Sequence, residues 1–287
     1  EYHTPVGSLR TVTVYDERTR TAGITISHVE RYPFSGPADY AALEYLFRHA
    51  HAEPNDAGYL AEAERIGDRG FLVAYVSASA SPMHFIQREL MPLETFFFEL
   101  HDRPDEVRRL TEAIQGYWQE TLSVASRCPA EVFLLGANYD SAIQHPRFFA
   151  ESIQPALAEF AAELHRQGKF LLTHTDGENR GLLGHYVASG FDIADSVCPS
   201  PMTRLSIGQV REAFAGRITI MGGIPSVSLV RESMTDLQFE RYLDDFFAQI
   251  GRGDRLILGV SDTTPPAAEF RRLRAIADRV EAFGPVG

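Results

Sequence analysis

The chain has 287 residues, 44% of them hydrophobic and 23% charged, which is typical of a globular protein. A net charge of −12 argues against nucleic acid and against an anionic membrane surface as partners, because both are bound through basic surfaces. Two cysteines, Cys128 and Cys198, are too few for a disulfide framework, and no apolar run approaches the length of a membrane span. We therefore expect a cytoplasmic protein.

The first 30 residues predict a β-hairpin that leads into the main fold. Two runs rich in β-branched residues, 10–15 and 21–28, flank the charged, turn-like stretch 16–20. His28 lies at the end of the second run. There it is either a substrate-binding side chain or a solvated residue of an edge strand.

From residue 71 to the end, apolar strands alternate with amphipathic helices. The expected strands are 71–76, 131–135, 170–172, 191–197, 217–221 and 255–258. Such alternation is typical of parallel strands joined by helical crossovers. A doubly wound sheet alternates in the same way, but no Gly-x-Gly-x-x-Gly turn or P-loop supports a nucleotide site. We therefore expect a (β/α)8 TIM barrel, one domain over 1–287, with 1–30 as the hairpin extension and 71–287 as the main βα units.

Six strands are two fewer than an eight-stranded barrel needs. The sequence opens at Glu1 without a methionine and in the middle of a pattern. We expect either that a segment with a first strand precedes Glu1 or that an irregular strand is hidden from the pattern. Among the helices, capping boxes are predicted at 206–209 and 235–238, and Pro155 should kink the helix that begins at Pro146.

Polar, glycine-bearing or proline-bearing segments follow all six strands at the same end. They are 77–81, 136–140, 174–179, 198–202, 222–226 and 259–264. In a barrel these ends converge on one mouth, which is where active sites lie. Each segment alone could be a turn or a helix cap, so the expectation of a site rests on the six together.

His174 and Asp176 are the leading candidates for this site, because alternate residues at a strand end point to one side. An imidazole and a carboxylate can bind a divalent metal, or can form a base that is oriented by an acid. Asp262, at another strand end, is a further ligand, a base or the N-cap of the last helix. Glu178 could complete the metal site or handle protons.

Other strand-end residues are candidates for contacts with a substrate. Asn138, Tyr139 and Asp140 offer hydrogen-bonding groups directly after the second strand. Cys198, a further candidate for binding substrate, is open to two interpretations, as a thiolate ligand from the adjacent strand or as a small buried hydrophobic residue.

The residues at and between these strand ends resemble a known family. They are Pro146-Arg-Phe-Phe, Pro155 and Gly168, the strand Leu171-Leu-Thr-His-Thr-Asp-Gly177, Gly190-Phe-Asp-Ile, Gly222-Gly-Ile-Pro and a late Thr-Pro segment. They are similar to the uroporphyrinogen decarboxylase superfamily, and more closely to its methyltransferase-like branch, which serves corrinoid-dependent methyl transfer. The opening His3-Thr-Pro-Val-Gly7 is similar to a hairpin found early in that branch. The resemblance covers nearly the whole chain and implies a (β/α)8 barrel.

In the methyltransferases of this family, a zinc ion is held by a His-x-Cys pair and by a Cys within a late Gly-Cys-Gly turn. His174 matches that His, but Asp176 stands where the first Cys belongs. Val260 falls near the place of the second, with Asp262 two residues on. The resemblance therefore implies an oxygen-rich site of His174, Asp176 and Asp262 for zinc or another divalent metal.

The leading hypothesis is metal-assisted transfer of a methyl group between a small methylated substrate and a carrier. The carrier would be a corrinoid on a partner protein, or a folate. One alternative is a metal-independent decarboxylase or lyase with His174 and Asp176 as an acid/base pair, and another is a non-catalytic barrel that binds a ligand. Few arginines lie in the loops, which disfavours a polycarboxylated tetrapyrrole as substrate. A homodimer is expected only from the general frequency of such assemblies.

Overall fold

The computed structural model describes residues 1–24 and 26–286. The chain forms two compact units, Glu1–Gly136 with Ala162–Lys169, and Ala137–Ala161 with Phe170–Gly287. The organisation of residues 1–287 as a single domain stays a prediction.

The lead-in forms two small antiparallel sheets. β1 (Tyr2–Thr4) pairs with β2 (Gly7–Leu9), and β3 (Val12–Val14) pairs with β4 (His28–Arg31). The predicted turn over residues 16–20 is wrong, because α1 (Glu17–Thr21) occupies it. Asp16 accepts a hydrogen bond from the Thr19 N–H and the Thr19 hydroxyl interacts with the Asp16 N–H, and this capping box stabilises the first turn. The strand expected at 21–28 begins only at His28, and residue 25 lies outside the described residues.

Helices make up most of the rest of the first unit. They are the 3-10 turn η1 (Pro37–Asp39), α2 (Tyr40–Arg48), α3 (Ala57–Ile66), the 3-10 turn η2 (Gly67–Arg69), α4 (Pro82–Phe85), the π-helix η3 (Ile86–Leu90), α5 (Leu93–Asp102) and α6 (Pro104–Ser126). Leu110, Ile114 and Trp118 of α6 recur at helical spacing and are fully buried, so they form the apolar stripe of this helix. The Trp118 indole N–H donates to the Ser79 carbonyl, which satisfies the one polar atom of this buried ring.

Two parallel strands belong to the first unit. β5 (Val73–Tyr75) pairs with β6 (Val132–Ala137), with Val73 opposite Val132 and Tyr75 opposite Leu134. β6 extends to Ala137, where the second unit begins. β5 is shorter than the predicted 71–76, and the Tyr75 side chain is 71% exposed.

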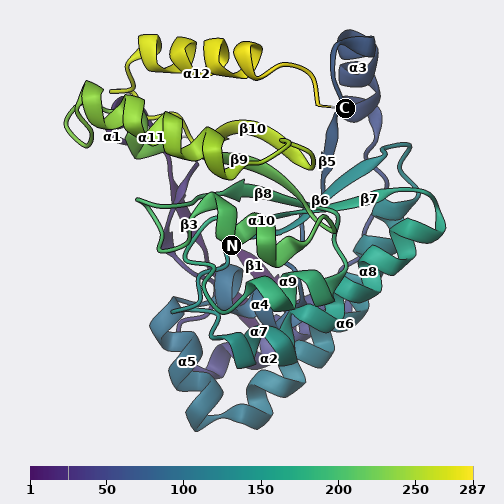
Figure 1. Ribbon diagram of the computed structural model, residues 1–287. Helices are drawn as coiled ribbons and strands as arrows, with labels where there is room; N and C mark the ends of the chain where they lie inside the picture. Colours follow the sequence, from purple (N-terminus) through teal and green to yellow (C-terminus); the bar gives the residue numbers. More distant parts are fainter. Residues whose placement is uncertain (25, 287) are drawn as a thin grey trace. The chain divides into compact units, whose positions relative to one another are not determined.

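Four parallel strands follow one another in the second unit. They are β7 (Phe170–His174), β8 (Ile193–Val197), β9 (Thr219–Pro225) and β10 (Leu256–Ser261), paired in chain order (Figure 1). The segments between and after them are α9 (Leu183–Ser189), α10 (Ile207–Phe214), the 3-10 turn η4 (Ser226–Leu229), α11 (Asp236–Gln249) and α12 (Phe270–Phe283). Both predicted capping boxes are confirmed, at the starts of α10 and α11.

The helix predicted from Pro146 is interrupted rather than kinked. α7 (Pro146–Ser152) ends before Ile153, and α8 (Gln154–Arg166) begins directly after it. Pro155 falls in the first turn of α8, where the missing N–H of proline has no intrahelical acceptor to lose. Within the second unit, Phe149 of α7 packs against Tyr139 and Tyr186 in a buried aromatic cluster.

The α/β class is confirmed: the two main strands of the first unit are parallel, the four strands of the second unit are parallel, and helical segments separate successive strands. Closure of an eight-stranded barrel stays a prediction. Among the described residues, no helix is both long enough and apolar enough to cross a lipid bilayer.

Candidate active site

The carboxyl ends of three strands in the second unit bring a histidine and two aspartates together. His174 ends β7, Asp195 lies on the adjacent β8, and Asp262 follows β10. His174 and Asp195 are paired directly across the parallel ladder. Because parallel strands end at the same edge of a sheet, this edge collects their terminal side chains, as it does in other α/β proteins.

The shortest contact of the cluster joins His174 to Asp195. Nδ1 of His174 lies 2.7 Å from Oδ2 of Asp195, and the two side chains are only 19% and 20% exposed. A carboxylate only accepts hydrogen bonds, so Nδ1 carries the proton and Nε2 is the lone-pair atom of the neutral ring. Nε2 lies 3.9 Å from Oδ1 of Asp262.

The charge state of His174 follows from this environment. Burial alone would lower the pKa of the imidazole, but the hydrogen bond and charge of Asp195, with the charges of Asp176 and Asp262, outweigh burial and raise the pKa above its usual value. Among the described residues, no Lys or Arg side chain forms an ion pair with any of these three aspartates. The cluster is therefore negative, and it favours a cation.

Asp176 lies two residues after His174 and is also partly buried. Its Oδ2 accepts a hydrogen bond from the Asn138 side-chain amide at 3.3 Å. Burial, followed by the charge of Asp262, raises the pKa of the Asp176 carboxyl, although His174 opposes the shift. Asp176 thus takes up a proton more readily than an exposed aspartate does.

The backbone is strained at several of these strand ends. Asn138, Ser196 and Asp262 adopt left-handed conformations with φ of 51°, 56° and 58°. Such values are uncommon outside glycine, and they concentrate at functional sites. The pairing of β8 with β9 is irregular between Ala194 and Val197, and a bulge of this kind re-aims the side chains beside it, here Asp195.

Ser261, the residue before Asp262, connects three neighbouring strands by hydrogen bonds. Its hydroxyl is almost fully buried, donates to the Val197 carbonyl at 2.6 Å and accepts from the Gly223 N–H at 3.2 Å. One side chain therefore joins β8, β9 and β10 immediately before Asp262. Gly222 is required beside it, because its φ is +111° and a Cβ would lie 3.3 Å from the Val197 backbone.

The carboxylates of Asp140 and Glu178 accept hydrogen bonds from the backbone of the loops around them. Asp140 accepts from the Glu178 N–H at 3.0 Å and from the Ala142 N–H at 2.8 Å. Glu178 in turn accepts from the Arg180 N–H at 2.9 Å and, through its other oxygen, from the Arg204 N–H at 3.0 Å. These contacts connect the loops after β6, β7 and β8. A catalytic role for Glu178 and a substrate contact for Asp140 stay predictions.

The remaining predicted residues lie in differing environments. Tyr139 is fully buried, with its hydroxyl 2.8 Å from that of Thr173. Cys198 is buried with its sulfur 3.5 Å from that of Met202. Burial, assisted by the charge of Asp176, raises the pKa of the Cys198 thiol to about 11, so the thiol is neutral near pH 7. His28 is an exposed residue in the first unit, at the start of β4.

Sequence reasoning did not single out Asp195 or Ser261. Asp195 lies inside an apolar run that indicates a strand, and only the register of β7 against β8 places it beside His174. Ser261 belongs to the polar segment 259–264, which did signal a strand end. Neither its burial nor its two backbone partners could be derived from that pattern.

The donor atoms of the cluster are an imidazole nitrogen and carboxylate oxygens, which are ligands of divalent metals. Within the described ranges, no group of three or more His, Cys, Asp or Glu side chains is gathered so that it could hold a metal. The Nε2 atom of His174, which the Asp195 hydrogen bond leaves available, lies 3.9 Å from Oδ1 of Asp262. Two ligands of one tetrahedral zinc are about 3.4 Å apart, so a small inward rotation of the half-exposed Asp262 would bring these two donors to that spacing. The Asp195 hydrogen bond to Nδ1 is the partner that metal-bound histidines usually have. His174 and Asp262 are thus two candidate donors, and metal binding stays a prediction.

Comparison with known proteins supports the fold. No family model matches the sequence, and no curated protein matches it. Among solved structures, the chain is similar to a methyltransferase from Methanosarcina mazei, with a TM-score of 0.58 and 15% sequence identity, over 90% of this chain and 73% of that one. At this identity the likeness shows a shared α/β fold.

Proposed function

We propose that the chain is a methyltransferase that moves a methyl group between a small methylated substrate and a corrinoid or folate carrier. The observation that carries the proposal is the His174 imidazole, which Asp195 holds so that Nε2 faces Asp262 at the strand ends. The shared fold with a methyltransferase supports it, as does the resemblance of the sequence at these strand ends. A corrinoid, if used, would arrive on a partner protein.

We further propose that His174, Asp176 and Asp262 hold zinc or another divalent cation. A bound divalent metal would supply Lewis acidity, which polarises a leaving heteroatom or lowers the pKa of an acceptor. The chain's own residues would prepare the site for it. Asp195 keeps the proton on Nδ1 so that Nε2 can donate its lone pair, and Asn138 holds Asp176 by a hydrogen bond. Ser261 fixes the backbone from which Asp262 projects.

A second candidate is a metal-independent decarboxylase or lyase. The 2.7 Å bond between His174 and Asp195 favours it, because a carboxylate-bound imidazole with a raised pKa is suited to take up and release protons near neutral pH. In this mechanism Nε2 would accept a proton from the substrate, and Asp195 would stabilise the imidazolium that results. Asp195, in place of the expected Asp176, is then the acid that orients the base.

Carrier dependence and metal removal separate the two candidates. Methyl transfer that needs a supplied corrinoid or folate, and that chelation abolishes and zinc restores, supports the methyltransferase. Turnover of a carboxylated substrate that survives chelation and needs no carrier supports the lyase. A His174→Ala variant should lose activity in either case, so this variant locates the site. The dependence on a carrier and the response to chelation identify the reaction.

A further inference from the structure

The loop after β6 contacts the loop after β7 on both sides of Asp176. The Asn138 N–H donates to the His174 carbonyl at 3.0 Å, and the Asn138 side-chain amide donates to Oδ2 of Asp176 at 3.3 Å. The Asp140 carboxylate accepts from the Glu178 N–H at 3.0 Å, two residues after Asp176. Asn138 and Asp140 therefore contact the backbone before Asp176, the Asp176 side chain and the backbone after it.

Both oxygens of the Asp140 carboxylate accept hydrogen bonds from backbone groups. Oδ2 accepts from the Glu178 N–H, and Oδ1 accepts from the Ala142 N–H at 2.8 Å. In the same loops, the Asp140 N–H donates to the Gln144 side-chain oxygen at 2.9 Å, and the Ser141 N–H donates to the Glu178 carbonyl at 2.8 Å. Hydrogen bonds to a carboxylate are stronger than neutral ones, so Asp140 joins its own loop firmly to the next one.

Gly177 allows the two loops to approach closely. Its φ is +131°, and a Cβ at this position would lie 2.6 Å from the Tyr139 carbonyl oxygen and 3.1 Å from Cβ of Asp140. A side chain at position 177 would therefore push the loop after β7 away from Asp140 and strain the turn. Gly177 follows Asp176 directly, so this close approach sets the direction in which the backbone leaves Asp176.

The position of the Asp176 carboxylate depends on this turn. The bond that it accepts from Asn138 is 3.3 Å long, whereas charge-assisted hydrogen bonds are about 2.7–2.9 Å long, so Asn138 holds it weakly. The Gly177 N–H also interacts with the Asp176 carboxyl, and the turn sets the direction of that N–H. The contact of Asp140 with the turn therefore acts on Asp176 through the backbone.

We infer, on the basis of the proposed function, that Asp140 is a positioning residue of the candidate active site and sets where the Asp176 carboxylate lies beside His174. Asp140 does this by holding the Glu178 N–H, and it needs no contact with a metal or a substrate. Its removal should therefore alter the site through Asp176 alone. Residues that orient the ligands of a metal in this way are part of how the metal is bound.

The test uses two substitutions that disturb the contact in different ways. Asp140→Asn removes the charge and replaces one acceptor oxygen by an NH2 group, whereas Gly177→Ala pushes the loops apart and leaves every charge in place. The affinity of each variant for Co²⁺ is measured by competition with a chromophoric chelator, and the visible spectrum of the bound ion reports its donor atoms. Asp176→Asn, alone and combined with Asp140→Asn, completes a double-mutant cycle.

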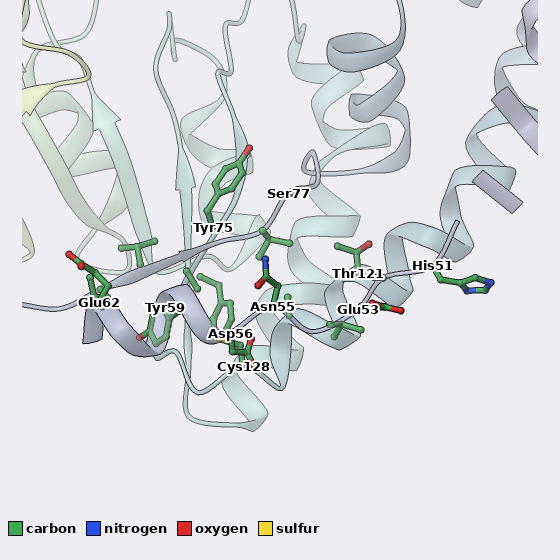
Figure 2. Close-up of a pocket in the computed structure, with 18 of the residues that line it drawn as sticks. His51, Glu53, Asn55, Asp56, Tyr59, Glu62, Tyr75, Ser77, Thr121 and Cys128 are labelled. Carbon is green, nitrogen blue, oxygen red and sulfur yellow. The ribbon is translucent and has the colours of Figure 1, made fainter. Parts of the chain in front are cut away.

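Three further variants serve as controls. Asp192 is matched to Asp140, because it is also partly buried and accepts a backbone N–H, that of Leu171 at 2.8 Å near the start of β7. Gly184→Ala controls for the loss of a glycine, because a Cβ there would meet no described atom within 4 Å. Glu53 lines a pocket of about 530 Å³ in the first unit (Figure 2), and Glu53→Gln removes one carboxylate charge from the chain without altering either loop.

We expect Asp140→Asn and Gly177→Ala to bind Co²⁺ roughly tenfold to a hundredfold more weakly than the wild type, with spectra shifted toward that of Asp176→Asn. Asp192→Asn, Gly184→Ala and Glu53→Gln should keep the affinity and the spectrum of the wild type. Once Asp176 is replaced, Asp140→Asn should change the affinity little. Unchanged binding in Asp140→Asn would overturn the inference, and so would an equal loss of affinity with and without Asp176.

Crystal structures of the wild type and of the two variants give a measurement that needs neither metal nor turnover. A wild type that binds no Co²⁺ would contradict the proposed metal site, and these structures would then decide the role of Asp140. Displacement of the Asp176 carboxylate by about 1 Å or more relative to His174 is expected, since shifts of that size alter a site. A carboxylate that stays in place would overturn the inference. If Gly177→Ala does not fold, Asp140→Asn decides.

Discussion

His174 and Asp195 lie opposite each other on β7 and β8, with 2.7 Å between Nδ1 and Oδ2. The pairing register of the strands creates this contact, because the two residues are 21 positions apart in the sequence. Its chemical effect is to assign one ring nitrogen to Asp195 and to leave the other for a metal, a substrate or a proton. Both candidate reactions depend on that division of roles.

Removal of the Asp195 charge should lower the pKa of His174. In Asp195→Asn the imidazole keeps a neighbour of the same shape but loses the main contribution that opposes burial, so its pKa should fall. Titration of the His174 ring by NMR measures this directly. If the neutral imidazole is the active form, the acidic limb of the pH–rate profile moves to lower pH in the variant. Asp244→Asn, a surface change in an ion pair with Arg279, is the control, and it should leave both titrations in place.

The raised pKa of His174 also predicts how stability depends on pH. A histidine whose folded-state pKa is above its unfolded value stabilises the fold fully below about pH 6.5, and this contribution is lost as pH rises through the folded pKa. Urea unfolding of the wild type and of His174→Gln can be measured at several pH values from about 5.5 to about 9. The difference between their free energies of unfolding should shrink as pH rises. A difference that grows with pH would contradict the assigned direction.

Ser261→Ala should weaken both the fold and the site. The change leaves the Val197 carbonyl and the Gly223 N–H without their buried partner, which should cost about 1–3 kcal/mol in the free energy of unfolding. Ser226→Ala is a suitable control, because the partly exposed Ser226 hydroxyl contacts the Met202 sulfur and, among the described residues, bonds no backbone group. Urea unfolding compares the two. Equal decreases in the free energy of unfolding for the two variants would mean that the Ser261 hydrogen bonds across β8, β9 and β10 do not stabilise the fold.

Metal content tests the proposed ligand set. Elemental mass spectrometry of protein that was never exposed to chelator should find close to one equivalent of a divalent metal. His174→Ala and Asp262→Asn should both lose it. Asparagine tolerates the left-handed backbone of position 262, so the second variant removes charge without new strain. Folded wild-type protein with no bound metal would move the weight to the acid/base mechanism.

Two helix starts and the end of β7 could be predicted from the sequence, whereas β6, β9 and β10 extend beyond their predicted ends. The capping boxes at Ser206 and Thr235 join residues only three positions apart, so they do not depend on how distant parts of the chain pack. The apolar-to-polar transition at His174 marked the end of β7. The strand predicted to end at residue 258 continues to Ser261, so β10 ends three residues later than its pattern indicated, directly before Asp262. Parallel strands require those ends to share an edge, so proximity of the two residues followed from the class of fold.

The features that the sequence could not predict depend on the register between strands and on which elements pack against them. Asp195 needed the alignment of β7 with β8, and no local pattern contains that alignment. The helix at Glu17–Thr21 was missed because its charged residues resemble a turn, although Asp16 and Thr19 form its cap. The exposure of Tyr75 contradicted a strand composition that predicts burial, since composition does not specify whether a neighbouring strand is present.

The most direct test of the central claim is the visible spectrum of a corrinoid during turnover. Reduced cobalamin is mixed with the protein and a panel of methylated amines, thioethers and methoxy compounds, and methylcobalamin with candidate acceptors tests the reverse direction. The account predicts conversion between the methylated and unmethylated corrinoid with at least one compound, in the wild type and not in His174→Ala, or the equivalent result with a folate. Turnover that proceeds fully without any carrier, or conversion that persists in folded His174→Ala, would contradict it.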